Sequence, residues 1–366
     1  MSQRIDTVVI GGSQAGLATG YHLKRLGVDH VILDENHRVG AAWRNRWDSL
    51  RLFTPGRYSG LPGMPYPGPP WSLPGKDEIA GYLEAYAARF ELPVRTGVTV
   101  GRVTTDGDGY VVETDGGPMS AENVVVATGA FHHPRIPAFA DALDPEITQM
   151  HSSDYRRPAQ LKDGAVLIVG AGSSGGEIAL ELAEHHQVWL SGRDPGQEPD
   201  SDGPISIRLL TPIIWFMASR VVNVANPIGR RVRQKFLYPP RGIPRGRVTR
   251  DDLHDAGVGW VARTAGVKDG RPRLEDGKVL DVANVIWCTG FLTNYGWIDI
   301  PVFDDHGYPI HERGVVESQP GLYFMGLLFQ RTLSSALIGG MGRDAGYIAR
   351  RIRDRQLQGR ASDPVR

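Results

Sequence analysis

The chain has 366 residues, and its 41 lysines and arginines balance 41 aspartates and glutamates, so it carries no formal net charge. Without a strong overall field, it is not expected to be drawn to nucleic acid or to an anionic membrane by its net charge. A single cysteine excludes a disulfide framework, a four-cysteine metal site and a CxxC redox pair. The length is enough for two domains, each with its own core.

No uncharged apolar run is long enough to span a bilayer, and the first expected strand starts by residue 7, which leaves no room for a signal peptide. We therefore expect a cytoplasmic protein with no integral membrane segment, no nucleic-acid partner and no metal ion. The expected partner is a small-molecule substrate, and the sequence is compatible with a homo-oligomer.

Residues 7–34 predict a βαβ unit with a phosphate-binding turn. The turn glycines allow a tight bend, and the free N–H groups of the first helical turn would face a pyrophosphate. A carboxylate 23 residues after the first glycine stands where a ribose is bound. The residues expected to bind this first cofactor are Gly11, Gly12, Ser13, Gln14, Ala15, Gly16, Asp34 and Glu35.

Residues 166–193 repeat the pattern, which favours two dinucleotide sites over two unrelated glycine-rich loops. Again 23 residues separate the first glycine from the acceptor end, but that end is now an arginine. A guanidinium pairs with a 2′-phosphate whereas a carboxylate repels it, so this site is expected to take NADPH. The alternative is a solvated arginine at a strand end. The residues expected at this second site are Gly170, Gly172, Ser173, Ser174, Gly175, Ser191 and Arg193.

Each unit is followed by a buried strand that ends in Thr-Gly, where small residues let the backbone approach a nucleotide. A further strand ends in glycine near the C-terminus. These ends add the candidates Ala127, Thr128, Gly129, Cys288, Thr289, Gly290 and Gly326. The predicted fold is α/β, with two Rossmann-like dinucleotide-binding domains. One is discontinuous over residues 1–158 and 291–366, and the other, inserted in it, covers residues 159–290.

Residues 56–75 are rich in proline, glycine and aromatic side chains, which excludes a regular helix or a central strand. We expect an ordered loop that wraps a ligand, with a flexible linker as the alternative. Residues 76–91 predict an amphipathic helix, and residues 94–114 a hairpin. Backbone groups near Val100 are expected to meet an adenine.

Residues 205–224 are the most apolar segment, and residues 230–250 follow with eight basic residues and no acid. The functional interpretations are a cover over a lipophilic substrate, peripheral membrane contact, or extra grip on the NADPH phosphates. The alternative is an insertion that packs its apolar side chains and solvates its arginines. Together, the apolar segment (residues 205–224) and the aromatic loop (residues 56–75) suggest an apolar substrate pocket, called the greasy pocket below. The last residues, from 350, are polar and expected to fray.

With these motifs in view, the chain resembles the class B flavin-containing monooxygenases, among them the plant YUCCA-type and related bacterial enzymes. The resemblance covers nearly the whole length. Besides the two turns it rests on Gly40-x-x-Trp43, Trp47-Asp48-Ser49-Leu50-Arg51-Leu52, residues 61–67 and 82–87, His151-Ser152-x-x-Tyr155 and Cys288-Thr289-Gly290-Phe291.

The resemblance implies FAD in the discontinuous domain, NADPH in the insert, and O2 as co-substrate. The reduced flavin would form a C4a-(hydro)peroxide that oxygenates a soft nitrogen or sulfur nucleophile, or a carbonyl. Trp43 and Arg51 are expected at the flavin, a helix N-terminus among the small residues of 331–345 is expected to approach it, and Arg51 and His151 are the candidates for assisting the chemistry. The alternatives are a flavin monooxygenase of the arsenic-resistance type, an NADPH oxidase or quinone reductase, and a non-enzymatic redox sensor.

Overall fold

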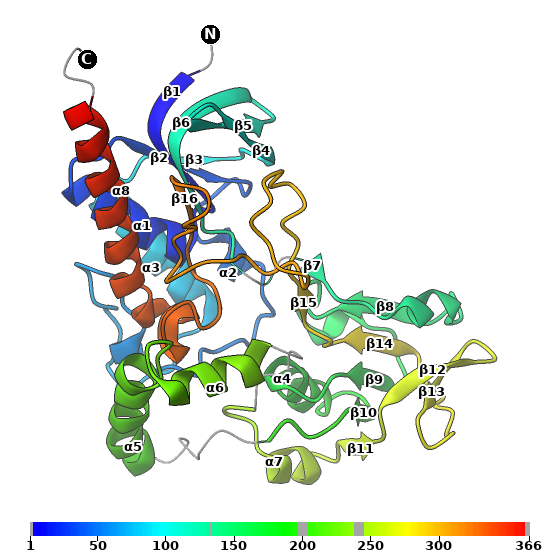
Figure 1. The fold of residues 1–366 in the computed structure, drawn as a ribbon. Coiled ribbons are helices and arrows are strands. Elements are labelled where there is room, and N and C mark those ends of the chain that lie inside the picture. Colours follow the sequence, from blue (N-terminus) through cyan, green and yellow to red (C-terminus); the bar gives the residue numbers. More distant parts are fainter. Residues whose placement is uncertain (1–2, 130, 132, 197–203, 238–244, 363–366) are drawn as a thin grey trace.

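The computed structural model describes residues 3–129, 131, 133–196, 204–237 and 245–362. Arg241, one of the eight basic residues of the 230–250 segment, lies outside this part of the chain. Two α/β halves, each built on its own sheet, lie side by side in Figure 1, the first above and the second at the lower right. The predicted α/β class with two Rossmann-like halves is confirmed.

The first sheet has seven strands. They are β1 (Gln3–Ile10), β2 (His30–Asp34), β3 (Val94–Thr96), β4 (Val100–Asp106), β5 (Gly109–Thr114), β6 (Gly117–Val126) and β16 (Leu322–Phe324). Their order is β3-β2-β1-β6-β5-β4, with β16 also beside β6. β1 is parallel to β2 and β6, and its register pairs Val8 with Val31 and Val124. β4 and β5 form the predicted hairpin.

Successive residues of these strands face two different cores, as the pleat of a strand requires. Val9 and Ile32 pack against helices α1 (Gln14–Arg25), α3 (Lys76–Arg89) and α8 (Gly342–Ser362). Val8 and Val31 pack on the opposite side with the hairpin and residues 295–303. The three helices therefore cover one face of the sheet, as Figure 1 shows, and the amphipathic helix predicted from residue 76 is confirmed.

The second sheet is fully parallel, in the order β11-β10-β9-β14-β8. Its strands are β8 (Thr148–His151), β9 (Val166–Val169), β10 (Val188–Ser191), β11 (Gly259–Val261) and β14 (Asn284–Trp287). Helices α4 (Ser173–Leu182) and α7 (Arg250–Asp255) pack together on one face, and the two-stranded β12 (Thr264–Lys268) and β13 (Arg271–Leu274) lie by the other.

The boundary predicted at residue 158 is placed too late. β8 precedes it, yet β8 pairs with β14 and so belongs to the inserted half. The chain crosses between the halves at β7 (His133–Pro134) and β15 (Phe291–Leu292), which pair antiparallel. Since β16 pairs with β6, the chain does return to the first sheet after the insertion.

The apolar segment departs from the second sheet and packs against the first half. It forms α5 (Pro204–Phe216), the π turn η4 (Met217–Val221) and α6 (Pro227–Leu237), seen below the first half in Figure 1. The Val224 N–H donates to the Arg331 carbonyl at 2.9 Å, which ties this segment to the C-terminal region. Within the described ranges, no helix is long and apolar enough to cross a membrane.

The remaining elements are short. They are α2 (Ala41–Arg44), η1 (Gly56–Tyr58), η2 (Ala138–Ala142), η3 (Pro158–Gln160), η5 (Leu333–Ala336) and η6 (Ile338–Gly340). The loop of residues 56–75 contains the 3₁₀ turn η1 and neither an α-helix nor a strand, as predicted.

Candidate functional site

The first glycine-rich turn joins β1 to α1. Gly11 has a φ of +108°, and a Cβ there would lie 2.6 Å from the Ala127 carbonyl oxygen. A Cβ on Gly16 would lie 1.9 Å from the Gly11 carbonyl oxygen. Real Cβ contacts are essentially never shorter than 3.0 Å, so both positions require glycine.

The N-terminus of α1 is open to an anion. Ser13 is its N-cap residue but provides no side-chain cap, and the first turn holds no acidic residue. The Ser13 hydroxyl donates instead to Gln14 Oε1 at 2.5 Å, and this oxygen also accepts from Trp43 Nε1 at 2.9 Å. Gly326 approaches the same turn, because a Cβ on it would lie 3.1 Å from the Ala15 Cβ. The structure thus gathers these predicted residues around one helix end.

Asp34 lies at the end of β2, beside this turn. Its Oδ2 accepts the Gly12 N–H at 2.7 Å, and its Oδ1 accepts the Asn36 N–H at 2.8 Å. These bonds fix the carboxylate at the turn edge, where a ribose diol would meet it. Of the two remaining candidates, Glu35 is exposed at the next position and Val100 is the half-buried first residue of β4.

The end of β6 supplies a polar atom without a partner. The Thr128 hydroxyl oxygen is buried, and nothing in the described chain bonds to it. The preceding Ala127 carbonyl closes on Gly11, and the following Gly129 has a φ of +76°. An orphaned hydroxyl next to an uncapped helix is what a phosphate-containing cofactor would satisfy, so these residues fit FAD.

The second turn, between β9 and α4, repeats the first. Gly170 has a φ of +114°, and a Cβ there would lie 2.2 Å from the Cys288 carbonyl oxygen. A Cβ on Gly175 would lie 1.8 Å from the Gly170 carbonyl oxygen. Gly172 is the N-cap of α4, again with no side-chain cap and no acid in the first turn, which Ser173 and Ser174 begin. This turn fits a second dinucleotide for the same reasons.

At the acceptor end of this unit, the two predicted residues differ in their surroundings. The Ser191 hydroxyl is buried, donates to the Ala262 carbonyl at 2.9 Å and accepts the Thr264 N–H at 2.8 Å. These bonds give Ser191 a structural task between β10 and β12. Arg193 is exposed just beyond the strand.

Arg245, a member of the basic run, contributes here in a way that the sequence did not reveal. Its side chain is 2% exposed and donates to Asp194 at 2.9 Å and to the Ala171 carbonyl at 3.4 Å. Its guanidinium lies 5.0 Å from the centre of the Trp260 ring. The hydrogen bond from Arg245 lowers the pKa of Asp194, so the carboxylate beside Arg193 is matched by a buried positive charge. The Nε of Arg245 is buried and has no partner within the described residues.

The two candidates for assisting the chemistry are both engaged in structural contacts. His151 is 1% exposed, with Nδ1 2.9 Å from the Ser153 hydroxyl and Nε2 3.0 Å from the Gly290 carbonyl oxygen. Burial lowers its pKa, which favours the neutral ring at pH 7. Arg51 is exposed and donates to the Leu73 carbonyl at 3.2 Å, holding the aromatic loop.

Cys288 and its neighbours pack against the second turn, and the Cys288 thiol is not a reactive group. Burial raises the pKa of the Cys288 thiol to about 12, so it stays protonated near neutral pH. The Thr289 hydroxyl donates to the Arg135 carbonyl, and Gly290 has a φ of +80°.

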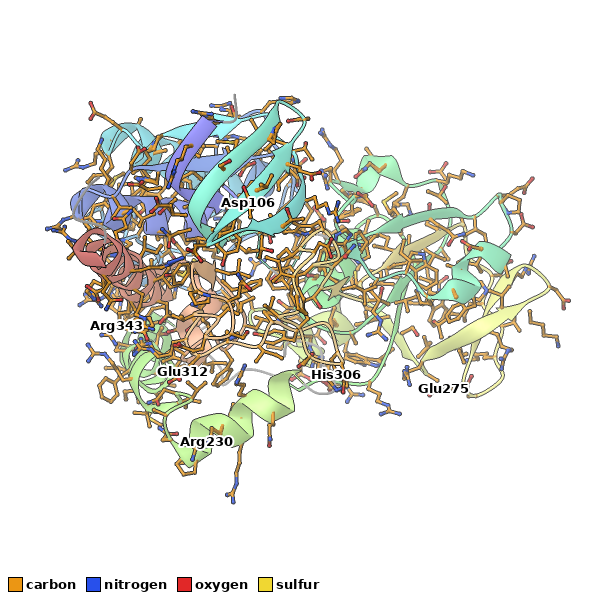
Figure 2. All side chains as sticks on the ribbon, turned by 45° about the horizontal axis from the view of Figure 1, so that its top comes forward. Asp106, Arg230, Glu275, His306, Glu312 and Arg343 are labelled. Carbon is orange, nitrogen blue, oxygen red and sulfur yellow. The ribbon has the colours of Figure 1, made fainter. Side chains whose placement is uncertain are left out.

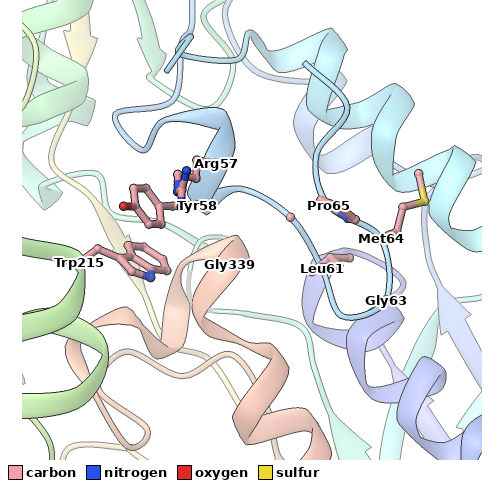
Figure 3. Close-up of a pocket in the computed structure, with 9 residues that line it drawn as sticks. Arg57, Tyr58, Leu61, Gly63, Met64, Pro65, Trp215 and Gly339 are labelled. Atoms are coloured by element: carbon pink, nitrogen blue, oxygen red, sulfur yellow. The ribbon is translucent and has the colours of Figure 1, made fainter. Parts of the chain in front are cut away.

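A cavity of about 510 Å³ lies between the aromatic loop and α5. Tyr58 and Trp215 stack there, with ring centres 4.9 Å apart and 27° between the planes, and Figure 3 shows both beside Gly339. The structure therefore brings together the two segments from which the sequence predicts a greasy pocket. Its lining residues are Arg57, Tyr58, Gly60, Leu61, Gly63, Met64, Pro65, Trp215 and Gly339.

Comparison with known proteins identifies the family. A family model described as pyridine nucleotide-disulphide oxidoreductase matches residues 8–221. An uncharacterized oxidoreductase CzcO-like from Geobacillus kaustophilus is 42% identical over 349 residues, which are 95% of this chain and 98% of that protein. Indole-3-pyruvate monooxygenase YUCCA1 from Oryza sativa is 36% identical over 182 residues, 49% of this chain and 45% of that one. A solved flavin-containing monooxygenase from Stenotrophomonas maltophilia has a TM-score of 0.77 and 27% identity, covering 96% and 99% of the two chains. The chain belongs to the class B flavin monooxygenase family.

Membership in this family makes the chain a flavin-dependent enzyme, and FAD and NADPH are the cofactors of class B flavin monooxygenases. The wider family model carries disulphide oxidoreductases in its description. This chain has one cysteine in its whole sequence, and a dithiol needs two. The scaffold is therefore shared with the disulphide enzymes, whereas their redox pair is absent.

Two buried carboxyl groups escaped the sequence analysis. Glu177 lies in α4, 3.5 Å from Arg247, and burial raises its pKa to about 7. Asp344 lies in the first turn of α8, where its Oδ1 accepts from Arg331 Nε at 2.8 Å and burial raises its pKa. Asp344 is the one acid among the small residues of 331–345, a signal that could have marked it. Nothing in the sequence marks Glu177.

Proposed function

We propose that the chain is an NADPH-dependent FAD monooxygenase that uses O2 to oxygenate a small organic substrate. The observation that carries the proposal is the pair of matching turns at residues 11–16 and 170–175, in a chain of the class B flavin monooxygenase family. FAD would supply oxygen activation, through the C4a-(hydro)peroxide that the family resemblance implies, and NADPH would supply the hydride.

In this proposal, the residues of the first turn hold FAD. The uncapped first turn of α1 receives the pyrophosphate, Asp34 meets the ribose, and the Thr128 hydroxyl takes up the bond that the protein leaves open. The helix dipole of α1 points its positive end at the phosphates.

The second turn holds NADPH. Exposed Arg193 is placed to pair with the 2′-phosphate. Arg245 supports it indirectly, because it pairs with Asp194 and so removes the local repulsion that this carboxylate would exert on a phosphate.

For the substrate, we propose an apolar or aromatic molecule with a soft nitrogen or sulfur nucleophile, or a carbonyl. The cavity beside Tyr58 and Trp215 supports this class, since its volume of about 510 Å³ is in the range of small-molecule sites. Arg57 at the same cavity would suit an acidic group on the substrate. The YUCCA1 relative is named for indole-3-pyruvate, which combines an aromatic ring with a keto acid.

The alternative is a flavin monooxygenase of the arsenic-resistance type, which would share the cofactor sites and differ in substrate. The 42%-identical relative is named an uncharacterized oxidoreductase, which is compatible with this alternative. An NADPH oxidase or quinone reductase would share the reductive half of the reaction only. A cytoplasmic location, a homo-oligomer and the absence of a nucleic-acid partner stay predictions.

The test is NADPH consumption by flavin-loaded protein over a panel of sulfides, amines, ketones, indole-3-pyruvate and arsenite, with H2O2 measured in parallel. The proposal predicts that one organic class raises NADPH consumption and lowers the H2O2 yield. Stimulation by arsenite alone would favour the arsenic-type alternative. H2O2 equal to NADPH consumed, with every compound, would reject oxygenation in favour of an oxidase.

A further inference from the structure

The outer side of α5 presents an apolar stripe to solvent. Leu209, Ile213 and Phe216 follow one another at helical spacing and are 65%, 61% and 57% exposed. The inner side of the same helix is anchored, because Trp215 stacks on Tyr58. The helix is therefore attached through Trp215 while its most apolar side faces solvent. An ordinary surface helix turns its apolar side toward the core.

Exposed large apolar side chains are concentrated around this stripe. Seven of the fourteen large apolar side chains that are exposed in the described chain lie between residues 209 and 228. Single exposed apolar residues are normal, but a contiguous group marks an interaction site. The seven are Leu209, Leu210, Ile213, Ile214, Phe216, Met217 and Ile228.

The charges within the segment that carries the stripe have one sign. No aspartate or glutamate occurs anywhere from residue 204 to residue 250. Exposed arginines border the apolar residues on α5, η4 and α6, and Figure 2 shows Arg230 on the outer edge of the molecule. They are Arg208, Arg220, Arg230 and Arg231. Since the whole chain is neutral, this face is a local positive region rather than part of a general one.

Two occupants would bury an apolar stripe: a second copy of the chain, or a lipid surface. In a two-fold dimer the same patch meets itself, so the arginines of one copy would face those of the other. Residues 204–250 contribute no carboxylate to relieve that repulsion. An anionic lipid surface accepts both features at once, taking up the apolar side chains and attracting the arginines.

We infer that α5 and α6 dock the protein on anionic membranes, with the helices lying in the plane of the lipid headgroups. At 13 residues, α5 is about 20 Å long, too short to cross a bilayer and suited to lying on one. Leu209, Ile213 and Phe216 enter the headgroup boundary, and the arginines meet lipid phosphates. The inference does not depend on the oxygenation reaction.

The test is flotation of the full-length, flavin-loaded protein with vesicles of phosphatidylcholine, alone or mixed with phosphatidylglycerol. The wild type is expected to bind the mixed vesicles and to lose this binding at high salt. The double variant Ile213→Asn/Phe216→Asn is expected to bind at least tenfold more weakly. The matched control is Ile310→Asn/Leu357→Asn, which removes two exposed apolar side chains elsewhere (58% and 53% exposed) and is expected to bind like wild type.

A further double variant tests the charge. Arg230→Gln/Arg231→Gln is expected to lower the preference for phosphatidylglycerol several-fold. Flavin content and thermal unfolding verify that each variant is folded.

The inference is overturned if wild-type protein fails to float with mixed vesicles, or if the two apolar double variants bind equally. It is also overturned if light scattering finds a dimer that Ile213→Asn/Phe216→Asn converts to monomer without any vesicle binding. That result would assign the stripe to a second copy of the chain.

Discussion

The substitution Gly175→Ala tests the second cofactor site with the least disturbance elsewhere. The new Cβ would lie 1.8 Å from the Gly170 carbonyl oxygen, and real Cβ contacts stay above 3.0 Å. The turn and the start of α4 must therefore separate by more than about 1 Å. A shift of this size breaks well-aligned hydrogen bonds from the first helical turn to a pyrophosphate.

The size of the effect follows from those bonds. A hydrogen bond to a charged group contributes about 1.5–3 kcal/mol, so the loss of two weakens NADPH binding by about 3 kcal/mol or more. At about 1.4 kcal/mol per factor of ten, the half-saturating NADPH concentration rises roughly 100-fold. FAD should stay bound, because its predicted turn lies in the other half of the molecule.

The assay is anaerobic bleaching of the flavin against NADPH concentration, with FAD content measured on the same sample. The matched control is Gly81→Ala: Gly81 is also a helical glycine, but a Cβ there would meet nothing within 4 Å. This control should bind both cofactors like wild type and gain slight stability. Unchanged NADPH saturation in Gly175→Ala would refute the assignment, and loss of FAD with NADPH binding retained would reverse it.

Three further outcomes follow from the same geometry. Arg193→Ala should raise the NADPH KM about tenfold and leave the NADH KM nearly unchanged; equal effects would reject the 2′-phosphate contact. Burial raises the pKa of Glu177 from 4.5 to about 7, so its contribution to stability is lost as pH rises through this interval. Relative to wild type, the free energy of unfolding of Glu177→Gln should therefore rise as the pH goes from 4.5 to about 7, by at most about 3 kcal/mol, as measured by urea unfolding at a series of pH values. A difference between the two proteins that does not change with pH would contradict the burial argument. Cys288→Ala should keep NADPH-driven flavin reduction, since the raised pKa of the only thiol keeps it protonated, and a full loss of turnover in folded protein would revive a thiol mechanism.

The two βαβ units were predictable because their signals are local. Within about 30 residues each, apolar strands, obligatory glycines and helical spacing fix the turn, and the structure shows the same close approach of backbone at Gly16 and Gly175. Asp34 was predictable for the same reason, since its place follows from the spacing to the turn.

Long-range pairing was not predictable. β8 has four residues, and only its pairing with β14, more than 130 positions later in the chain, assigns it to the inserted half. The domain boundary was therefore placed after it. Arg245 is similar: its charge is visible in the sequence, but its burial beneath the second turn depends on how the insertion folds back.

The C-terminal helix shows how tertiary contacts override a polar composition. The residues from 350 were expected to fray, yet α8 continues to Ser362. Ile348 and Ile352 are fully buried in the first core. Arg353 and Arg355 donate to the carbonyls of Leu26 and Asp108, the latter at 3.0 Å, and so hold the polar side as well.

The site candidates fall into two groups, those selected for backbone geometry and those selected for side-chain chemistry. Gly11 and Gly170 were selected for backbone geometry, and both have the positive φ and the close backbone approach that a tight turn requires. His151 was selected for its chemical type, and the structure surrounds it with partners for both ring nitrogens. Whether a titratable side chain is open or engaged depends on its neighbours in space, which the sequence does not list.

The central claim is that this chain holds FAD in its discontinuous half and accepts hydride from NADPH bound in the insert. The most direct measurement is an anaerobic NADPH titration of the purified protein, followed by release and quantification of its flavin. The account predicts one FAD per chain, bleached fully by one equivalent of NADPH and far more slowly by NADH. A colourless protein that takes up no FAD on reconstitution, or a bound flavin that NADPH leaves oxidised, would contradict it.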